Sequence, residues 1–142
     1  MIVDDIPLMR IMLTKFVKTL GKKLFHKLES YEYIESVEIV EAPNGKVALE
    51  KLKRHPVDVI FLDLMMPEMD GLAFLEHQKN SSEFGHIPVI VCSAIGESQT
   101  RDKAEELGAK GYITKPFTLR AVEKTILSAL GNKSPTASGP TN

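Results

Sequence analysis

The chain has 142 residues, of which 43% are hydrophobic and 26% charged, and its formal net charge is −1. This size and composition are typical of one globular domain that buries its own core, and the balanced charge disfavours a nucleic-acid or membrane-surface binder. The sequence contains one cysteine, which excludes an intrachain disulfide, and no apolar run approaches the ~18 residues that span a bilayer, so we expect a cytoplasmic protein.

Short apolar runs alternate with longer amphipathic segments along the chain. Strands are expected, in chain order, at residues 2–4, 37–41, 57–63, 88–92 and 111–113, and the helices between and after them at residues 7–20, 45–54, 71–79, 99–107 and 119–130. This alternation predicts βαβ crossovers, and so an α/β fold with a doubly wound parallel sheet and helices on both faces. The runs VDVIFLD and IPVIVC are continuously apolar, as strands covered on both faces should be.

We expect the domain to span residues 1–131 and the small, polar residues 132–142 to form a disordered tail or a linker stub. Within the domain, residues 21–36 continue the helical pattern that precedes them. Apolar side chains recur there every three or four positions: Met9, Leu13, Phe16, Leu20, Leu24, Leu28 and Tyr31. Either the first helix extends through Gly21 and exposes Leu24, Phe25 and Leu28 as a partner or homodimer surface, or it breaks at Gly21 and the segment folds back.

Polar side chains follow four of the five expected strands. Asp4 and Asp5 follow the first, Asp63 ends the third, Ser93 follows the fourth and Lys115 lies just past the fifth. Ligands bind beyond the carboxyl ends of the strands in an open parallel sheet, so we expect these residues to converge. Three carboxylates tolerate each other around a hard cation such as Mg²⁺. The lysine and the hydroxyl would hold phosphoryl oxygens, and Asp63 would form an aspartyl phosphate.

In order along the chain, Asp4-Asp5, VDVIFLDLMMPEMDG, Ser93-Ala94 and YITKPF closely resemble the receiver domain of two-component response regulators, over residues 2–130. The resemblance implies a flavodoxin-like, five-stranded sheet in the order 2-1-3-4-5. It also implies a signalling switch rather than an enzyme, in which Asp63 accepts a phosphoryl group from a sensor histidine kinase or a phosphotransfer protein.

The resemblance further implies a role for each site residue. Asp4 and Asp5 would hold Mg²⁺ together with Asp63 and the backbone carbonyl of Met65, with Asp5 favoured over Asp4 as a direct ligand. Ser93 and Lys115 would bind the phosphoryl oxygens, and the rotamer of Tyr112 would report the state of Ser93. A cis peptide would join Lys115 to Pro116. A downstream protein would then bind the face of the fourth helix, fifth strand and fifth helix.

The sequence departs from the family pattern at several positions. Met65 and Ile95 are apolar where the family flanks the path of the attacking water, which predicts slow self-dephosphorylation. The first strand is short, and the 58 positions from Asp5 to Asp63 exceed the usual interval, with the excess in residues 21–36.

Other interpretations stay open at this point. A receiver separated from its output domain is one, and a Mg²⁺-dependent phosphohydrolase with an aspartyl nucleophile is another, although Leu64 and Met65 offer no general acid. A flavin- or nucleotide-binding module would need a Gly-rich loop, which DDIPLMR is not.

Three single residues have structural interpretations. Asp70 is interpreted as a helix cap, Tyr112 could be plain packing, and Cys92 is expected to be buried and inert.

Overall fold

The computed structural model describes residues 1–25, 36–94 and 98–131. Within these ranges, five parallel strands form one sheet in the order β2-β1-β3-β4-β5. The elements alternate along the chain as β1 (Ile2–Val3), α1 (Pro7–Phe25), β2 (Glu41–Ala42), α2 (Gly45–Leu52), β3 (Ile60–Asp63), α3 (Gly71–Asn80), β4 (Val89–Ser93), α4 (Ser98–Glu106), β5 (Gly111–Thr114) and α5 (Leu119–Gly131). The predicted α/β fold and its strand order are confirmed.

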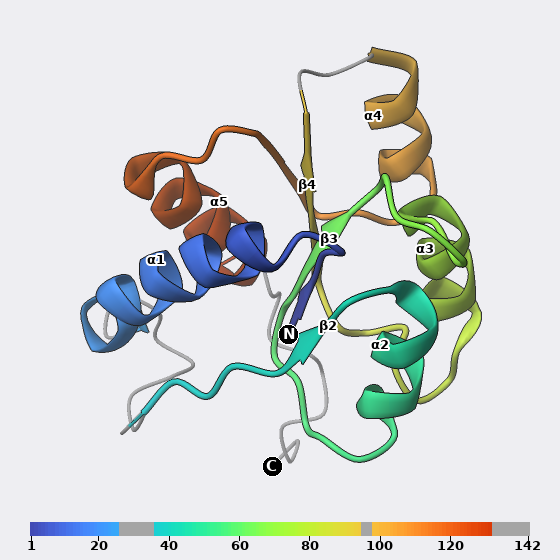
Figure 1. Ribbon diagram of the computed structural model, residues 1–142, viewed down its shortest axis with the longest axis horizontal. Helices are drawn as coiled ribbons and strands as arrows, with labels where there is room; N and C mark the ends of the chain where they lie inside the picture. Colours follow the sequence, from blue (N-terminus) through green and yellow to red (C-terminus); the bar gives the residue numbers. More distant parts are fainter. Residues whose placement is uncertain (26–35, 95–97, 132–142) are drawn as a thin grey trace, which may run out of the picture.

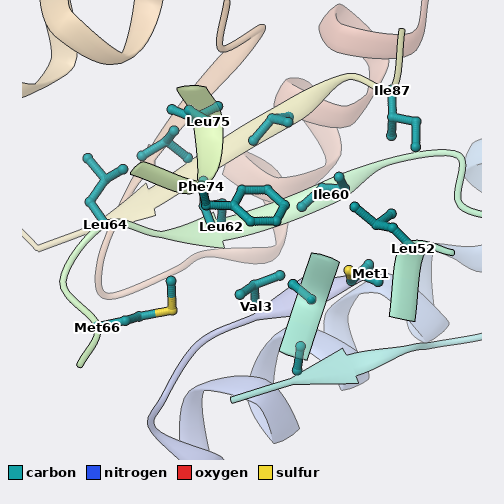
Figure 2. Close-up of a cluster of buried hydrophobic side chains, with 14 of the residues drawn as sticks. Met1, Val3, Leu52, Ile60, Leu62, Leu64, Met66, Phe74, Leu75 and Ile87 are labelled. Carbon is teal, nitrogen blue, oxygen red and sulfur yellow. The ribbon is translucent and has the colours of Figure 1, made fainter. Parts of the chain in front are cut away.

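The sheet separates two hydrophobic layers. Helices α1 and α5 lie together on one face, and α2, α3 and α4 cover the other (Figure 1). Successive strand residues alternate between the layers: Phe61 packs with α1 and α5, whereas Ile60 and Leu62 pack with Phe74 of α3 (Figure 2). Burial of each large side chain contributes roughly 1.5–3 kcal/mol, so the central strands are rigid supports for whatever their ends carry.

Side-chain caps fix where the helices begin. Asp70 accepts a hydrogen bond from the backbone N–H of Ala73 at 2.8 Å before α3, and Thr118 accepts one from Ala121 at 3.1 Å before α5. The Asp70 cap matches expectation, and a cap of this kind is worth about 1 kcal/mol. Gly108 closes the turn after α4 with a φ of 97°, which a side-chain-bearing residue rarely adopts.

Two predicted strand boundaries are wrong. The second strand was expected at residues 37–41 but consists of Glu41–Ala42, and the third was expected from residue 57 but begins at Ile60. Strand β2 pairs with β1, which has only two residues, and β3 begins where its ladder with β4 begins, at the pair of Ile60 with Val89. Because a ladder needs a partner on the neighbouring strand, the short β1 limits the edge strand β2.

The first helix continues past residue 20, where the shorter alternative would end it, and is interrupted at Gly21. It runs to Phe25, but Gly21 has φ 11° and ψ −118°, so the two parts meet at a kink rather than in one straight helix. The predicted overhanging surface at Leu24, Phe25 and Leu28 lies outside the described side chains, as do residues 26–35, residues 132–142 and Ile95. None of the helices in the described ranges has both the length and the apolar character needed to cross a bilayer.

Candidate functional site

The three predicted acids come together at one edge of the sheet. Asp63 is the last residue of β3, and Asp4 and Asp5 follow the neighbouring strand β1. Parallel strands end at the same edge, so the carboxylates that follow them meet there. One carboxylate oxygen from each acid lies within 4.8 Å of the others. The side chains of Asp4 and Asp63 are buried, whereas Asp5 is half-buried.

Lys115 reaches the same point from the end of β5, the edge strand beside β4. Its ammonium Nζ lies 2.9 Å from Asp4 Oδ2 and 3.5 Å from Asp63 Oδ2, and its side chain is only 15% exposed. The backbone N–H of Lys115 donates to the carbonyl of Ser93 at 2.7 Å, which ties the loop after β5 to the end of β4. The Lys115–Pro116 peptide bond is cis, as expected. Ser93 is buried at this end of β4.

The charges in the site are strongly coupled. Burial raises the pKa of Asp63 above its ordinary value; the Lys115 ammonium opposes this rise, and the Asp4 and Asp5 carboxylates add to it. Burial alone would lower the pKa of Lys115, but the hydrogen bond to Asp4 and the charge of Asp63 raise it overall. Lys115 therefore stays a cation. The ionised form of Asp63 is disfavoured by burial and by the neighbouring carboxylates, and a second positive charge nearby would stabilise it.

The donor atoms fit a hard divalent cation. Both oxygens of Asp4 are engaged, Oδ1 by the N–H of Ile6 at 2.9 Å and Oδ2 by Lys115. In contrast, Asp5 Oδ1 is buried and has no hydrogen-bond partner among the described residues. A buried carboxylate oxygen without a partner is costly, and a bound Mg²⁺ would satisfy it together with an oxygen of Asp63. This orphaned oxygen favours Asp5 over Asp4 as the direct ligand.

The loop after β3 fixes the Asp63 side chain through backbone contacts. The backbone N–H of Met65 donates to Asp63 Oδ1 at 3.2 Å, and that of Gly71 donates to the Leu64 carbonyl at 3.0 Å. A Cβ atom on Gly71 would come within 2.4 Å of the Asp63 carbonyl oxygen, so this close approach of α3 to β3 requires glycine. The Met65 side chain is 77% exposed and turns away from the core.

Tyr112 lies on β5 beside a surface hollow of about 640 Å³ between α4 and α5. The guanidinium of Arg101 is 5.5 Å from the centroid of the tyrosine ring, which is cation–π range. The Tyr112 hydroxyl is buried and has no hydrogen-bond partner in the described part of the chain.

One residue beside the site was missed from the sequence. The guanidinium of Arg10 donates to the backbone carbonyl of Asp4 at 2.6 Å. Arg10 is one of 18 basic residues, so composition does not single it out. A helical turn beginning at Pro7 does bring Arg10 back toward Asp4, and this was the available signal.

Comparison with known proteins agrees with this geometry. The family model described as the response regulator receiver domain matches residues 1–127. The chain belongs to this family. A relative, the chemotaxis protein CheY of Bacillus subtilis, is 35% identical over 130 residues, which cover 89% of this chain and 95% of CheY. This receiver domain is accordingly a component of two-component signalling.

Solved structures share the fold of this receiver domain. Vibrio cholerae chemotaxis protein CheY4 aligns with a TM-score of 0.75 and 25% identity, covering 91% of this chain and 95% of that protein. The receiver domain of the Pseudomonas aeruginosa sensor histidine kinase PA1611, solved with a magnesium ion in its active-site cleft, aligns with a TM-score of 0.72 and 18% identity, covering 92% and 94%. At that identity, the second match bears on the fold alone.

Proposed function

We propose that this receiver domain, spanning residues 1–131, is a phosphorylation-controlled switch that accepts a phosphoryl group on Asp63. The observation that carries the proposal is the convergence of Asp63 with Asp4, Asp5 and the Lys115 ammonium, all within salt-bridge or shared-ligand distance. A sensor histidine kinase or a phosphotransfer protein would be the donor. The P–N bond of its phosphohistidine breaks as a P–O bond to Asp63 forms, and the imidazole leaves with the bonding electron pair and is protonated.

Each residue has a role that follows from its position. Asp5, Asp63 and the backbone carbonyl of Met65 would hold Mg²⁺, which when bound neutralises charge on the phosphoryl oxygens and on the carboxylates around them. Lys115 would pair with another phosphoryl oxygen once Asp63 carries the group, and the Ser93 hydroxyl would donate to a third. Asp63 acts as the nucleophile because it is held at the end of a rigid strand.

The output would come from the face around Tyr112. Movement of the Ser93 hydroxyl toward the phosphoryl group opens space beside β5, and the Tyr112 ring can shift into it. The surface of α4, β5 and α5 then has two arrangements, and a downstream protein that binds one of them reads the signal. The hollow that Tyr112 lines lies on this face, between Arg101 of α4 and Lys124 of α5.

The proposal is tested with acetyl phosphate as a small donor. In the presence of Mg²⁺ we expect the intact protein to gain one phosphoryl mass, and no gain after Mg²⁺ is chelated. Beryllofluoride, which mimics a phosphoryl group, should shift the NMR signals of Tyr112 and its neighbours. A protein that stays unmodified, or that turns over generic phosphate esters continuously, would contradict a switch; the second outcome would favour the phosphohydrolase.

Met65 should set the lifetime of the phosphorylated state. Its side chain is apolar and 77% exposed, so it neither orients a water molecule nor supports the core. Replacement by asparagine adds an amide that can position water beside Asp63, and we expect the phosphoryl group to be lost roughly tenfold faster. The decay is followed by intact mass after the donor is removed. Met65→Leu serves as the control and should decay like the wild type; equal decay of Met65→Asn would disprove this role.

A further inference from the structure

Arg10, near the start of α1, connects the acidic site to β2. Its Nη1 donates to the Asp4 backbone carbonyl at 2.6 Å, and its Nε lies 3.6 Å from Glu41 Oε1. The arginine side chain is only 18% exposed, whereas that of Glu41 is 49% exposed. A guanidinium can direct donors at two acceptors at once because its N–H groups form a rigid planar fork. Arg10 thus holds two elements that come from different parts of the sequence.

The turn that carries the acids has little support from the sheet. Strand β1 ends at Val3, and the next backbone N–H, that of Asp4, donates to the Ala42 carbonyl at 3.1 Å. The Asp4 carbonyl belongs to the peptide that joins Asp4 to Asp5, and Arg10 is the donor that holds it. Rotation of that peptide would redirect the Asp5 side chain. The Asp5 Oδ1, which is buried and lacks a partner in the described residues, would move with it.

We infer that Arg10 is a positioning residue that orients the Asp4–Asp5 peptide so that Asp5 presents its carboxylate to Mg²⁺. The inference rests on the proposed function, since it assigns the Asp5 oxygen to the metal. Arg10 itself would contact neither the metal nor the phosphoryl group. It acts through the backbone, like other residues that do not bind a metal themselves but orient its ligands by hydrogen bonds.

Charge and geometry predict opposite effects of removing Arg10. A cation beside a metal site repels Mg²⁺, so its loss should strengthen binding if charge alone mattered. If Arg10 instead fixes the Asp4–Asp5 peptide, its loss weakens binding. Loss of a residue that orients a metal ligand typically weakens metal affinity by about 10–100-fold. The sign of the change therefore separates a positioning role from a purely electrostatic one.

The test is a calorimetric titration of Mg²⁺ into wild type, Arg10→Ala, Arg10→Lys and Lys18→Ala. We expect the dissociation constant for Mg²⁺ to rise about tenfold in Arg10→Ala. Arg10→Lys should be intermediate, because a single ammonium keeps the charge but cannot reproduce both contacts. Lys18 is exposed on the same helix, so Lys18→Ala removes an equal charge and should bind like the wild type. The melting temperature without Mg²⁺ is recorded for each variant.

Several results would overturn the inference. Tighter or unchanged Mg²⁺ binding by Arg10→Ala would do so, and so would a lower melting temperature with no change in affinity, which is what a merely structural residue would give. If Arg10→Ala does not fold, Arg10→Lys decides: wild-type affinity there contradicts the inference. A wild type that binds no Mg²⁺ overturns the proposed function as well, whereas a binding wild type with an equally binding Arg10→Ala overturns this inference alone.

The rate of phosphorylation gives an independent readout. With acetyl phosphate as donor, Arg10→Ala should need about tenfold more Mg²⁺ for half-maximal rate. At saturating Mg²⁺ its rate should approach that of the wild type, because Asp63 and Lys115 are unchanged. A rate that stays low at saturating Mg²⁺ would place the defect in the acceptor itself and contradict a role confined to Asp5.

Discussion

The Asp63→Asn variant is expected to accept no phosphoryl group from acetyl phosphate, while remaining folded. Asparagine has nearly the same shape as aspartate, but its amide is not a nucleophile toward phosphorus. Intact mass before and after incubation with Mg²⁺ and donor measures the effect directly. Asp70→Asn is the matched control, because it makes the same chemical change at the far end of the loop that follows Asp63, and asparagine caps a helix as well as aspartate does. A phosphoryl mass on Asp63→Asn would show that another residue is the acceptor.

The same variant should be more stable than the wild type when Mg²⁺ is absent. The pKa of Asp63 is raised in the folded protein, first by burial, so ionised Asp63 is disfavoured there relative to the unfolded chain. Stability from this group is fully present below its unfolded pKa and is lost as the pH rises through the raised pKa. At neutral pH we therefore expect the melting temperature of Asp63→Asn to exceed that of the wild type by a few degrees. The difference should shrink as the solution is acidified.

Added Mg²⁺ should reverse this order. The ion stabilises the native state by an amount that rises with the logarithm of its concentration divided by its dissociation constant, and Asp63 supplies one of its proposed ligands. The wild type should gain more in melting temperature than Asp63→Asn on titration with Mg²⁺. Equal gains would indicate that the ion binds without Asp63.

The Lys115→Ala variant should lose both stability and phosphoryl acceptance. Removal of the ammonium leaves Asp4 and Asp63, each about 4% exposed, without their shared cation. Breaking a buried ion pair in this way costs about 3–5 kcal/mol. We expect phosphorylation by acetyl phosphate to slow by about 10²-fold, because a preorganised positive charge at the transferring group is lost. Denaturant unfolding and intact mass measure the two effects.

Mg²⁺ affinity separates charge from positioning in the site. Lys115→Ala removes a cation from among the acids, so we expect it to bind Mg²⁺ more tightly than the wild type, opposite to Arg10→Ala. Lys103→Ala, an exposed position on α4, is the control and should change neither stability nor phosphorylation. The double variant Lys115→Ala with Asp4→Asn should regain part of the lost stability without regaining phosphorylation. If stability and phosphorylation return together, Lys115 acts only as a structural counterion.

The strand ends explain why so much of the site was predictable. A continuous apolar run that stops at an acid, as in the run ending at Asp63, indicates both a buried parallel strand and the edge at which its last side chain emerges. The same reasoning places Asp4, Asp5, Ser93 and Lys115 at that edge, where the structure has them. Caps such as Asp70 are equally local, because the hydrogen bond spans only three residues.

Sequence alone therefore determined the fold class, the order of elements and the edge at which the polar side chains gather, since each depends on local periodicity and on the rules of parallel sheets. Only the tertiary structure decided the lengths of β2 and β3, because a ladder extends no further than its partner strand allows, β1 for β2 and β4 for β3. It also decided that Lys115 lies nearer to Asp4 than to Asp63 and that Arg10 holds the Asp4 carbonyl. The Lys115 pairings join residues distant in the sequence, so no local pattern encodes them, whereas the Arg10 contact spans six residues and had only the turn at Pro7 as a signal.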